Sequence, residues 1–292
     1  MSEHPPGKLF ILNVQIEPTR DVEANLAQAE ALIFNARKNY AHFDLICLPE
    51  YFSLGMRKKL GQRLARQVMQ QSLDALERWA RLCRSYVVGG TIPEVHNNRI
   101  YDSVFLLDRR GKVLNRYRKI YLYADWGETA IFTPGSGAEV IDLGFTKLGL
   151  AVCRDLRFPS LFGGLTEKGA EIFCVPTTWN YPYETDWEVL GRCRALENQA
   201  YFVLTNITGR HPSEGAFFGR SMVVDYRGNV ISMMDDRPGY QVAHIDLKPL
   251  REWRRTFRVF DFCDVEYAID QHQSLDNVEH PEHIDSARAK LE

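Results

Sequence analysis

The sequence predicts an α/β fold, a four-layer α-β-β-α sandwich with an internal pseudo-two-fold repeat. The first observation is that three segments recur in the same order along the chain. The pairs are LICLPEYF (45–52) with IFCVPTTW (172–179), YVVGGTI (86–92) with YFVLTNI (201–207), and LLDRRGKVL (106–114) with VVDYRGNVI (223–231). The second observation is that strand-like and helix-like patterns alternate in both copies, which gives each half one sheet and two helices. Two sheets with apolar faces are expected to pack on each other, with the helices outside.

The first half begins with an apolar strand, FILNVQ (10–15). A helix over 21–38 follows, because its apolar residues share one face and Asp21 suits the N-terminal cap. A buried strand then ends at Pro49, and a longer helix covers about 58–84. Two further strands are joined by the turn D-R-R-G, whose glycine suits a positive φ.

The second half repeats this order. A buried strand from Leu148 to Val152 leads into Cys153, and a shorter helix over 159–168 has a proline near its first turn. The next strand ends at Pro176, a helix covers about 185–199, and the turn D-Y-R-G joins the last two strands. We expect residues 1–264 to form one domain and the polar, acidic residues 265–292 to form an arm or tail.

Composition limits the classes of partner. The 292 residues are 45% hydrophobic with a net charge of −2, so no basic surface points to nucleic acid or to an anionic membrane. The chain has no apolar run of about 18 residues, so we expect no membrane span. The N-terminus lacks the pattern of a signal peptide. We therefore expect a cytoplasmic protein. The six cysteines include no C-x-x-C pair, so we predict neither disulfides nor a metal site.

Three residues with catalytic potential occur in only one copy of the repeat. They are Glu50, Lys119 and Cys153, and Thr177 stands where the second copy would place a glutamate. A duplication normally keeps structural residues in both copies, so this asymmetry favours a site built on a repeated scaffold. A cysteine nucleophile needs a proton acceptor and a positive group, which a carboxylate and an ammonium supply. The alternatives are a solvated glutamate, a lysine on a basic hairpin and an inert buried cysteine.

The same motifs resemble the nitrilase superfamily, the carbon–nitrogen hydrolases. LICLPEYF, YRKIYLY and GLAVCRDLRFP are similar to the glutamate, lysine and cysteine motifs of that family, and the likeness covers about residues 8–260. The resemblance implies the sandwich fold, Glu50 as general base and acid, Lys119 as oxyanion stabiliser and Cys153 as nucleophile. It also implies that Glu128, in ETAIFTPG, orients Lys119. The resemblance further implies a homodimer or larger homo-oligomer that needs no cofactor.

The residues that follow the nucleophile receive specific expectations. The backbone N–H of Arg154 can be the second oxyanion donor, while Asp155 and Arg157 look structural, as a local ion pair or as helix-start contacts. The Arg154 side chain either points away from the cleft, which we favour, or meets a carboxylate of the substrate or of a partner chain. We predict that three residues of the pocket wall bind the substrate: Tyr51, Thr178 and Trp179. Further aromatic residues that flank the motifs are candidates for the same wall: Trp126, Tyr181 and Tyr183.

The resemblance implies an amidohydrolase that cleaves a linear carboxamide of a small molecule to a carboxylate and ammonia through a cysteine thioester. Hydrolysis of an N-carbamoyl amide is the alternative in the same superfamily. Nitrile hydrolysis is disfavoured, because Arg154 and Asp155 follow the nucleophile where nitrilases carry tryptophan and glutamate. The chain could instead be a thiol redox sensor. Such a sensor would need a resolving cysteine near Cys153, and the sequence has none close to it. A non-catalytic binding scaffold would tolerate loss of a triad residue, yet all three are present.

Overall fold

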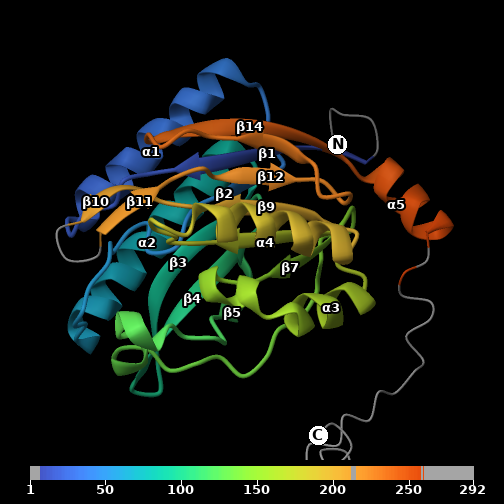
Figure 1. Cartoon of the computed structure of the whole chain (residues 1–292). Coiled ribbons are helices and arrows are strands. Elements are labelled where there is room, and N and C mark those ends of the chain that lie inside the picture. The colour runs from blue at the N-terminus through green and yellow to red at the C-terminus, as the bar shows by residue number, and fades with distance from the viewer. Residues whose placement is uncertain (1–6, 212–214, 258, 260–292) are drawn as a thin grey trace, which may run out of the picture. The chain divides into compact units, whose positions relative to one another are not determined.

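Two six-stranded β-sheets lie face to face in the computed structural model, which describes residues 7–211, 215–257 and 259 (Figure 1). The first sheet contains β1 (Lys8–Gln15), β2 (Leu45–Cys47), β3 (Tyr86–His96), β4 (Arg99–Leu107), β5 (Val113–Arg118) and β14 (Gly239–Asp246). The second contains β6 (Ile141–Asp142), β7 (Lys147–Leu150), β8 (Ile172–Pro176), β9 (Tyr201–Thr205), β12 (Met222–Val224) and β13 (Val230–Met233). A two-stranded hairpin, β10 (Thr208–His211) and β11 (Gly215–Phe218), lies outside both sheets.

The order of the strands shows the predicted duplication. The first sheet runs β14-β1-β2-β3-β4-β5, and the second runs β13-β12-β9-β8-β7-β6. In each half, three strands pair in parallel and two antiparallel strands follow: β1, β2, β3, β4 and β5 in one sheet, and β7, β8, β9, β12 and β13 in the other. The equivalent residues Cys47 and Cys174 meet across the sheet interface with their sulfurs 3.8 Å apart. The internal repeat and the α/β sandwich are therefore confirmed.

Side-chain alternation along the strands produces the four layers. On β1, Ile11 belongs to the core between the sheets, whereas its neighbour Leu12 packs toward the helices of the first half. Ile172 and Phe173 divide in the same way on β8. The helices over the first sheet are α1 (Val22–Asn39) and α2 (Gln62–Cys83), and those over the second are α3 (Pro159–Glu167) and α4 (Glu184–Glu197). Each large apolar side chain buried in this way contributes about 1.5–3 kcal/mol.

Local signals place the ends of these elements close to the prediction. The Asp21 carboxylate accepts a hydrogen bond from the Ala24 N–H at 3.0 Å and caps α1. Pro159 is the first residue of α3, where its missing N–H costs nothing. Gly111 and Gly228 have φ of +81° and +77° in the two equivalent turns, as their sequence predicted.

The strand that leads to Cys153 is shorter than predicted. It ends at Leu150, and Cys153 begins a 3-10 helix, η3 (Cys153–Arg157), with φ of +44°. The sequence analysis also did not predict β6, the hairpin of β10 and β11, β14 or α5 (Leu247–Thr256). β14 pairs antiparallel with β1 from Lys8 to Gln15, a contact between segments more than 220 positions apart that no local pattern encodes.

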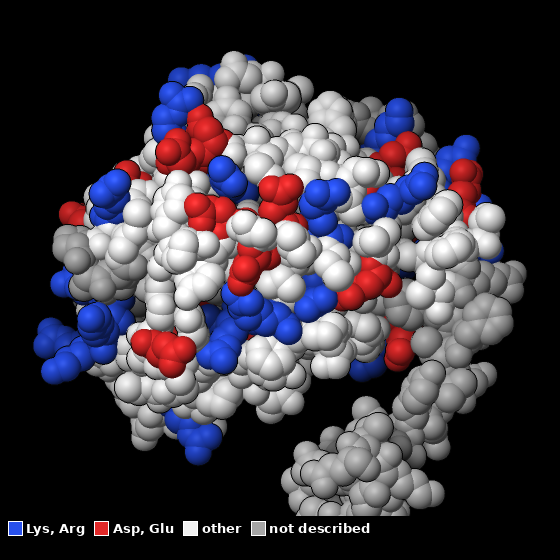
Figure 2. Space-filling view, viewed as in Figure 1, with Lys and Arg blue, Asp and Glu red and all other residues white. Residues whose placement is uncertain are grey.

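One compact unit ends at Thr256. The predicted arm, residues 265–292, lies outside the described residues, and so does the end of the predicted domain at residue 264. Within the described part, no helix is both long and apolar enough to span a membrane. Figure 2 shows acidic and basic side chains interspersed over one face, as expected for a net charge of −2.

Candidate active site

A buried lysine holds two glutamates together at one end of the sandwich. The Lys119 ammonium donates hydrogen bonds to Glu50 Oε1 and Glu128 Oε1, both at 2.8 Å. The side chains of Lys119 and Glu50 are 0% exposed and that of Glu128 is 8% exposed, so water does not screen these pairs. Lys119 directly follows β5 and its backbone N–H donates to the Asp102 carbonyl, which fixes the base of the side chain. Three predicted catalytic residues thus lie in one cluster.

Glu50 is positioned by the tight turn that follows β2. The backbone at Gly90 passes so close that a Cβ there would lie 2.1 Å from the Pro49 carbonyl oxygen. The next residue, Tyr51, has φ of +53°, and its N–H donates to the Thr91 hydroxyl at 3.0 Å. A positive φ at a tyrosine costs on the order of 1–3 kcal/mol and needs such support from its surroundings. The turn therefore holds Glu50 in a single orientation.

Glu128 accepts three hydrogen bonds. Besides Lys119, its carboxylate accepts from the Tyr51 hydroxyl at 3.0 Å and from the Tyr123 N–H at 2.8 Å. It begins the short 3-10 helix η2 (Glu128–Ala130), which follows η1 (Ala124–Trp126). A carboxylate held by three donors is a fixed support for the lysine rather than a group free to accept a proton.

Cys153 is presented by a strained turn. Its φ of +44° lies in the left-handed region, and Asp155 holds this geometry. The Asp155 carboxylate accepts from the Val152 N–H at 2.8 Å, the Tyr121 N–H at 3.0 Å and the Tyr117 hydroxyl at 2.6 Å. Burial raises the pKa of Asp155 to about 6 although these hydrogen bonds lower it. The structural role predicted for Asp155 agrees with these contacts.

The charges around Cys153 keep its thiol protonated at rest. Burial raises the pKa of Cys153 well above its usual value, the negative charge of Glu50 raises it further, and Lys119 opposes both. Burial lowers the pKa of Lys119, but Glu128 and Glu50 outweigh it and raise that pKa well above its usual value. The nucleophile therefore needs a base when it attacks, and the lysine stays positive.

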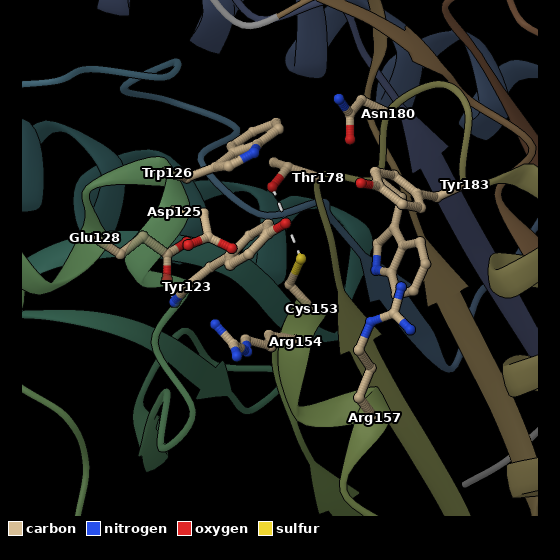
Figure 3. A pocket seen from close by; sticks show the side chains of 11 residues that line it. Tyr123, Asp125, Trp126, Glu128, Cys153, Arg154, Arg157, Thr178, Asn180 and Tyr183 are labelled. Carbon is tan, nitrogen blue, oxygen red and sulfur yellow. Dashed lines mark hydrogen bonds between the residues drawn. The ribbon is translucent and has the colours of Figure 1, made fainter.

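A cavity of about 280 Å³ opens onto the thiol (Figure 3). Cys153, Thr178, Trp179 and Glu128 line it, and Tyr123, Trp126, Asn180 and Tyr183 complete much of the wall. Of the predicted wall residues, Tyr181 does not line the cavity. Tyr51 does not line this cavity either. Its hydroxyl donates to Glu128 and its ring borders a smaller neighbouring cavity. Tyr51 therefore supports Glu128 instead of making the predicted contact with the substrate.

Two arginines of η3 line the same cavity. The Arg154 guanidinium lies 4.9 Å from the centre of the Tyr123 ring and donates to the Leu122 carbonyl at 3.1 Å. The favoured expectation that this side chain points away from the cleft was wrong (Figure 3). Arg157 forms an ion pair with Asp186 at 2.7 Å and lies over the Trp179 ring. The alternative of a local ion pair between Arg157 and Asp155 was therefore wrong. In the described residues Arg154 has no carboxylate partner.

Sequence reasoning missed a fourth carboxyl group near the cluster. Asp102 lies on β4, on the face that Val104 and Leu106 present to the core between the sheets, and it is 1% exposed. No hydrogen bond of good geometry reaches either of its carboxylate oxygens, although the Thr91 hydroxyl lies close enough to lower its pKa. Burial raises the pKa of Asp102 well above its usual value, as does the charge of Glu50, while Lys119 lowers it. The signal in the sequence was one acidic residue at an inward position of an apolar strand.

The described residues contain no group of three or more histidine, cysteine, aspartate or glutamate side chains suited to a metal ion. Their five cysteines are free.

Comparison with known proteins identifies the family. The family model for carbon–nitrogen hydrolases matches residues 13–255. The chain belongs to this family. A deaminated glutathione amidase of Bos taurus is 33% identical over 261 residues, 84% of this chain and 79% of that protein. A 2-oxoglutaramate amidase of Bacillus subtilis is 29% identical over 237 residues, 81% of this chain and 90% of that protein.

A solved structure agrees with this assignment. The Saccharomyces cerevisiae protein described as a member of branch 10 of the nitrilase superfamily has a TM-score of 0.78 at 27% identity, covering 86% of this chain and 94% of that one. The resemblance noted from the three motifs is therefore confirmed, and the chain is a carbon–nitrogen hydrolase of the nitrilase superfamily.

Proposed function

We propose that this carbon–nitrogen hydrolase cleaves a linear carboxamide to a carboxylate and ammonia through a thioester on Cys153. The observation that carries the proposal is the buried Glu50–Lys119–Glu128 cluster at the cavity that Cys153 lines. A thiol in the cavity wall, with a base and a fixed cation buried beside the cavity, supplies the groups that nucleophilic attack on an amide carbon requires. No metal ion is needed in this scheme.

In the first half of the reaction, Glu50 accepts the thiol proton as the sulfur attacks the amide carbon. Lysine has three N–H donors, and two of those on Lys119 already bind Glu50 and Glu128. The third, together with the backbone N–H of Arg154, is available for the developing oxyanion. Each such donor contributes on the order of 10²–10³ in rate.

In the second half, protonated Glu50 gives its proton to the leaving nitrogen, and ammonia departs. A thioester between the substrate acyl group and Cys153 remains. Glu50 then takes a proton from water, the hydroxide adds to the thioester, and the released thiolate recovers the proton. The carboxylic acid, the ammonia and the resting thiol are the products of one balanced cycle, and the acid then gives its proton to ammonia in solution to leave a carboxylate and ammonium.

For the substrate, we favour a small amide that carries a carboxylate, such as the ω-amide of a dicarboxylic acid. The cavity of about 280 Å³ suits a molecule of this size, and Arg154 offers a guanidinium without a carboxylate partner among the described residues. Relatives named as amidases of 2-oxoglutaramate and of deaminated glutathione support this choice. An N-carbamoyl acid also presents a carboxylate to Arg154 and is the second candidate.

A panel of substrates tests the proposal. Ammonia release is measured with a neutral aliphatic amide, an ω-amide of a dicarboxylic acid, an N-carbamoyl acid and a nitrile. We expect release to be highest with the ω-amide, to vanish in Cys153→Ala and to persist in Cys193→Ala, which removes an exposed thiol on α4. Release that survives in Cys153→Ala would contradict the assignment of the nucleophile.

Two expectations from the sequence remain proposals. We propose a cytoplasmic homodimer or larger homo-oligomer, on the basis of composition and of the family resemblance. Light scattering coupled to size-exclusion chromatography would give the mass, and a monomer at micromolar concentration would contradict the oligomer.

A further inference from the structure

Thr178 lies between the nucleophile and the base. Its hydroxyl oxygen is 3.9 Å from the Cys153 sulfur, the contact drawn as a dashed line in Figure 3, and its hydroxyl donates a hydrogen bond to Glu50 Oε2. In the described residues no hydrogen bond joins the sulfur to Glu50 directly. Thr178 belongs to the second copy of the repeated motif and Glu50 to the first, so the two halves of the fold supply the two ends of this contact.

Counting donors fixes the direction of both contacts. A hydroxyl has one hydrogen to donate, and an ionised carboxylate can only accept. The Glu50 carboxylate accepts from the Lys119 ammonium at 2.8 Å and, at its other oxygen, from Thr178, so the Thr178 hydrogen points to Glu50. The Thr178 oxygen then has lone pairs left for the sulfur, and the S–H group of Cys153 is the donor.

We propose that Thr178 is a catalytic residue that relays the thiol proton to Glu50. As the sulfur attacks the substrate, its proton moves to the Thr178 oxygen while the Thr178 hydrogen moves to Glu50 Oε2. One S–H bond and one O–H bond break, two O–H bonds form, and Thr178 ends as a hydroxyl again. The two transfers are concerted, so the threonine is never charged. This role adds to the substrate contact predicted for Thr178, which lines the cavity, and it rests on the proposed thioester chemistry.

The surroundings of Thr178 suit a relay. The side chain is buried, with 5% of the residue exposed, and its hydroxyl is fixed by Glu50, which is itself held by Lys119. The raised pKa of Cys153, caused by burial and then by Glu50, keeps the S–H proton in place until attack begins. A buried nucleophile of this kind gains from a preformed path to its base.

Two substitutions separate the hydroxyl from the shape of the side chain. Thr178→Val keeps the volume and removes the hydroxyl, whereas Thr178→Ser keeps the hydroxyl. We expect single-turnover ammonia release to fall about 100-fold in Thr178→Val and to stay within about tenfold of the parent in Thr178→Ser. Peptide mass spectrometry after reaction with iodoacetamide follows Cys153 without substrate, and we expect slower alkylation in the valine variant. Cys193, exposed on α4, is the internal control for folding.

The parent protein gives a second test that needs no substitution. Single-turnover rates measured across mixtures of H₂O and D₂O should curve with deuterium content, because two protons move together, and a linear dependence would overturn the relay. Full activity in Thr178→Val, or equal loss in both variants with unchanged Cys193 alkylation, would overturn it as well. If no amide releases ammonia but Cys153 alkylation still depends on the hydroxyl, the relay stands and the proposed function fails.

Discussion

Replacing Lys119 by methionine removes the only ammonium that contacts Glu50 and Glu128 in the described structure. Methionine keeps most of the length and apolar stem of lysine. Both carboxylates stay buried, and each loses a 2.8 Å charged hydrogen bond. Removing one partner of a buried ion pair costs about 3–5 kcal/mol, because the remaining charge is uncompensated. We expect a loss of this size in the free energy of unfolding of Lys119→Met at pH 7.

The pH dependence of this loss identifies its cause. The folded-state pKa of Lys119 is raised, so its stabilising contribution is fully present below the unfolded value of about 10.4 and is constant across neutral and acidic pH. In the variant, the two buried carboxylates relieve their repulsion by taking up a proton as the pH falls. We therefore expect the deficit to shrink between pH 7 and about pH 5.

Urea unfolding at several pH values measures this effect. Lys168→Met, at an exposed position after α3, is the matched control and should change stability by less than about 0.5 kcal/mol. Loss of one oxyanion donor should also lower kcat by a factor of about 10²–10³. A Lys119→Met protein as stable as the parent, or with a deficit that does not depend on pH, would refute the account of the cluster.

Three further predictions concern neighbouring residues. Burial raises the folded-state pKa of Asp102, so the parent loses stability as the pH rises above the unfolded value of about 4. The stability of Asp102→Asn relative to the parent should therefore increase from pH 4 to pH 7. A difference in unfolding free energy that stays constant over this range would contradict the prediction. For Asp155, whose pKa is about 6, the free energy of unfolding of the parent should fall by about 2 kcal/mol between pH 4 and pH 6, and Asp155→Asn should lack that slope in urea titrations. Arg154→Gln should lower kcat/KM for a carboxylate-bearing amide by about 10–100-fold, and kcat/KM for a neutral amide of equal length should fall less. Equal effects on the two amides would show that Arg154 does not bind the substrate carboxylate.

Much of the fold followed from the sequence because the signals were local or repeated. The equivalent motifs around Cys47 and Cys174 predicted equivalent strands, and the turn glycines predicted where hairpins form. The same comparison singled out Glu50, Lys119 and Cys153, since each breaks the repeat. Contacts between distant segments were beyond this reasoning. β14, for example, pairs with β1, more than 220 positions earlier in the chain.

The site beyond those residues depends on how the halves face each other. The sequence predicted Thr178 as a wall residue, which it is, but not the contact of its hydroxyl with Glu50, 128 positions earlier in the chain. Tyr51 turned out to support Glu128, 77 positions later. Asp102 reads as an ordinary strand residue until its burial next to the cluster is seen, and the direction of Arg154 follows from the strained turn at Cys153. Each of these is a tertiary fact that spacing along the sequence does not contain.

Trapping the acyl-enzyme tests the central claim, the thioester on Cys153, most directly. The protein is quenched in acid during turnover of an ω-amide of a dicarboxylic acid, and the peptide that carries Cys153 is examined by mass spectrometry. The account predicts that this peptide gains the mass of the substrate acyl group without its nitrogen, and that hydroxylamine removes the adduct. Ammonia released at full rate by Cys153→Ala, or an adduct on another residue during turnover, would contradict it.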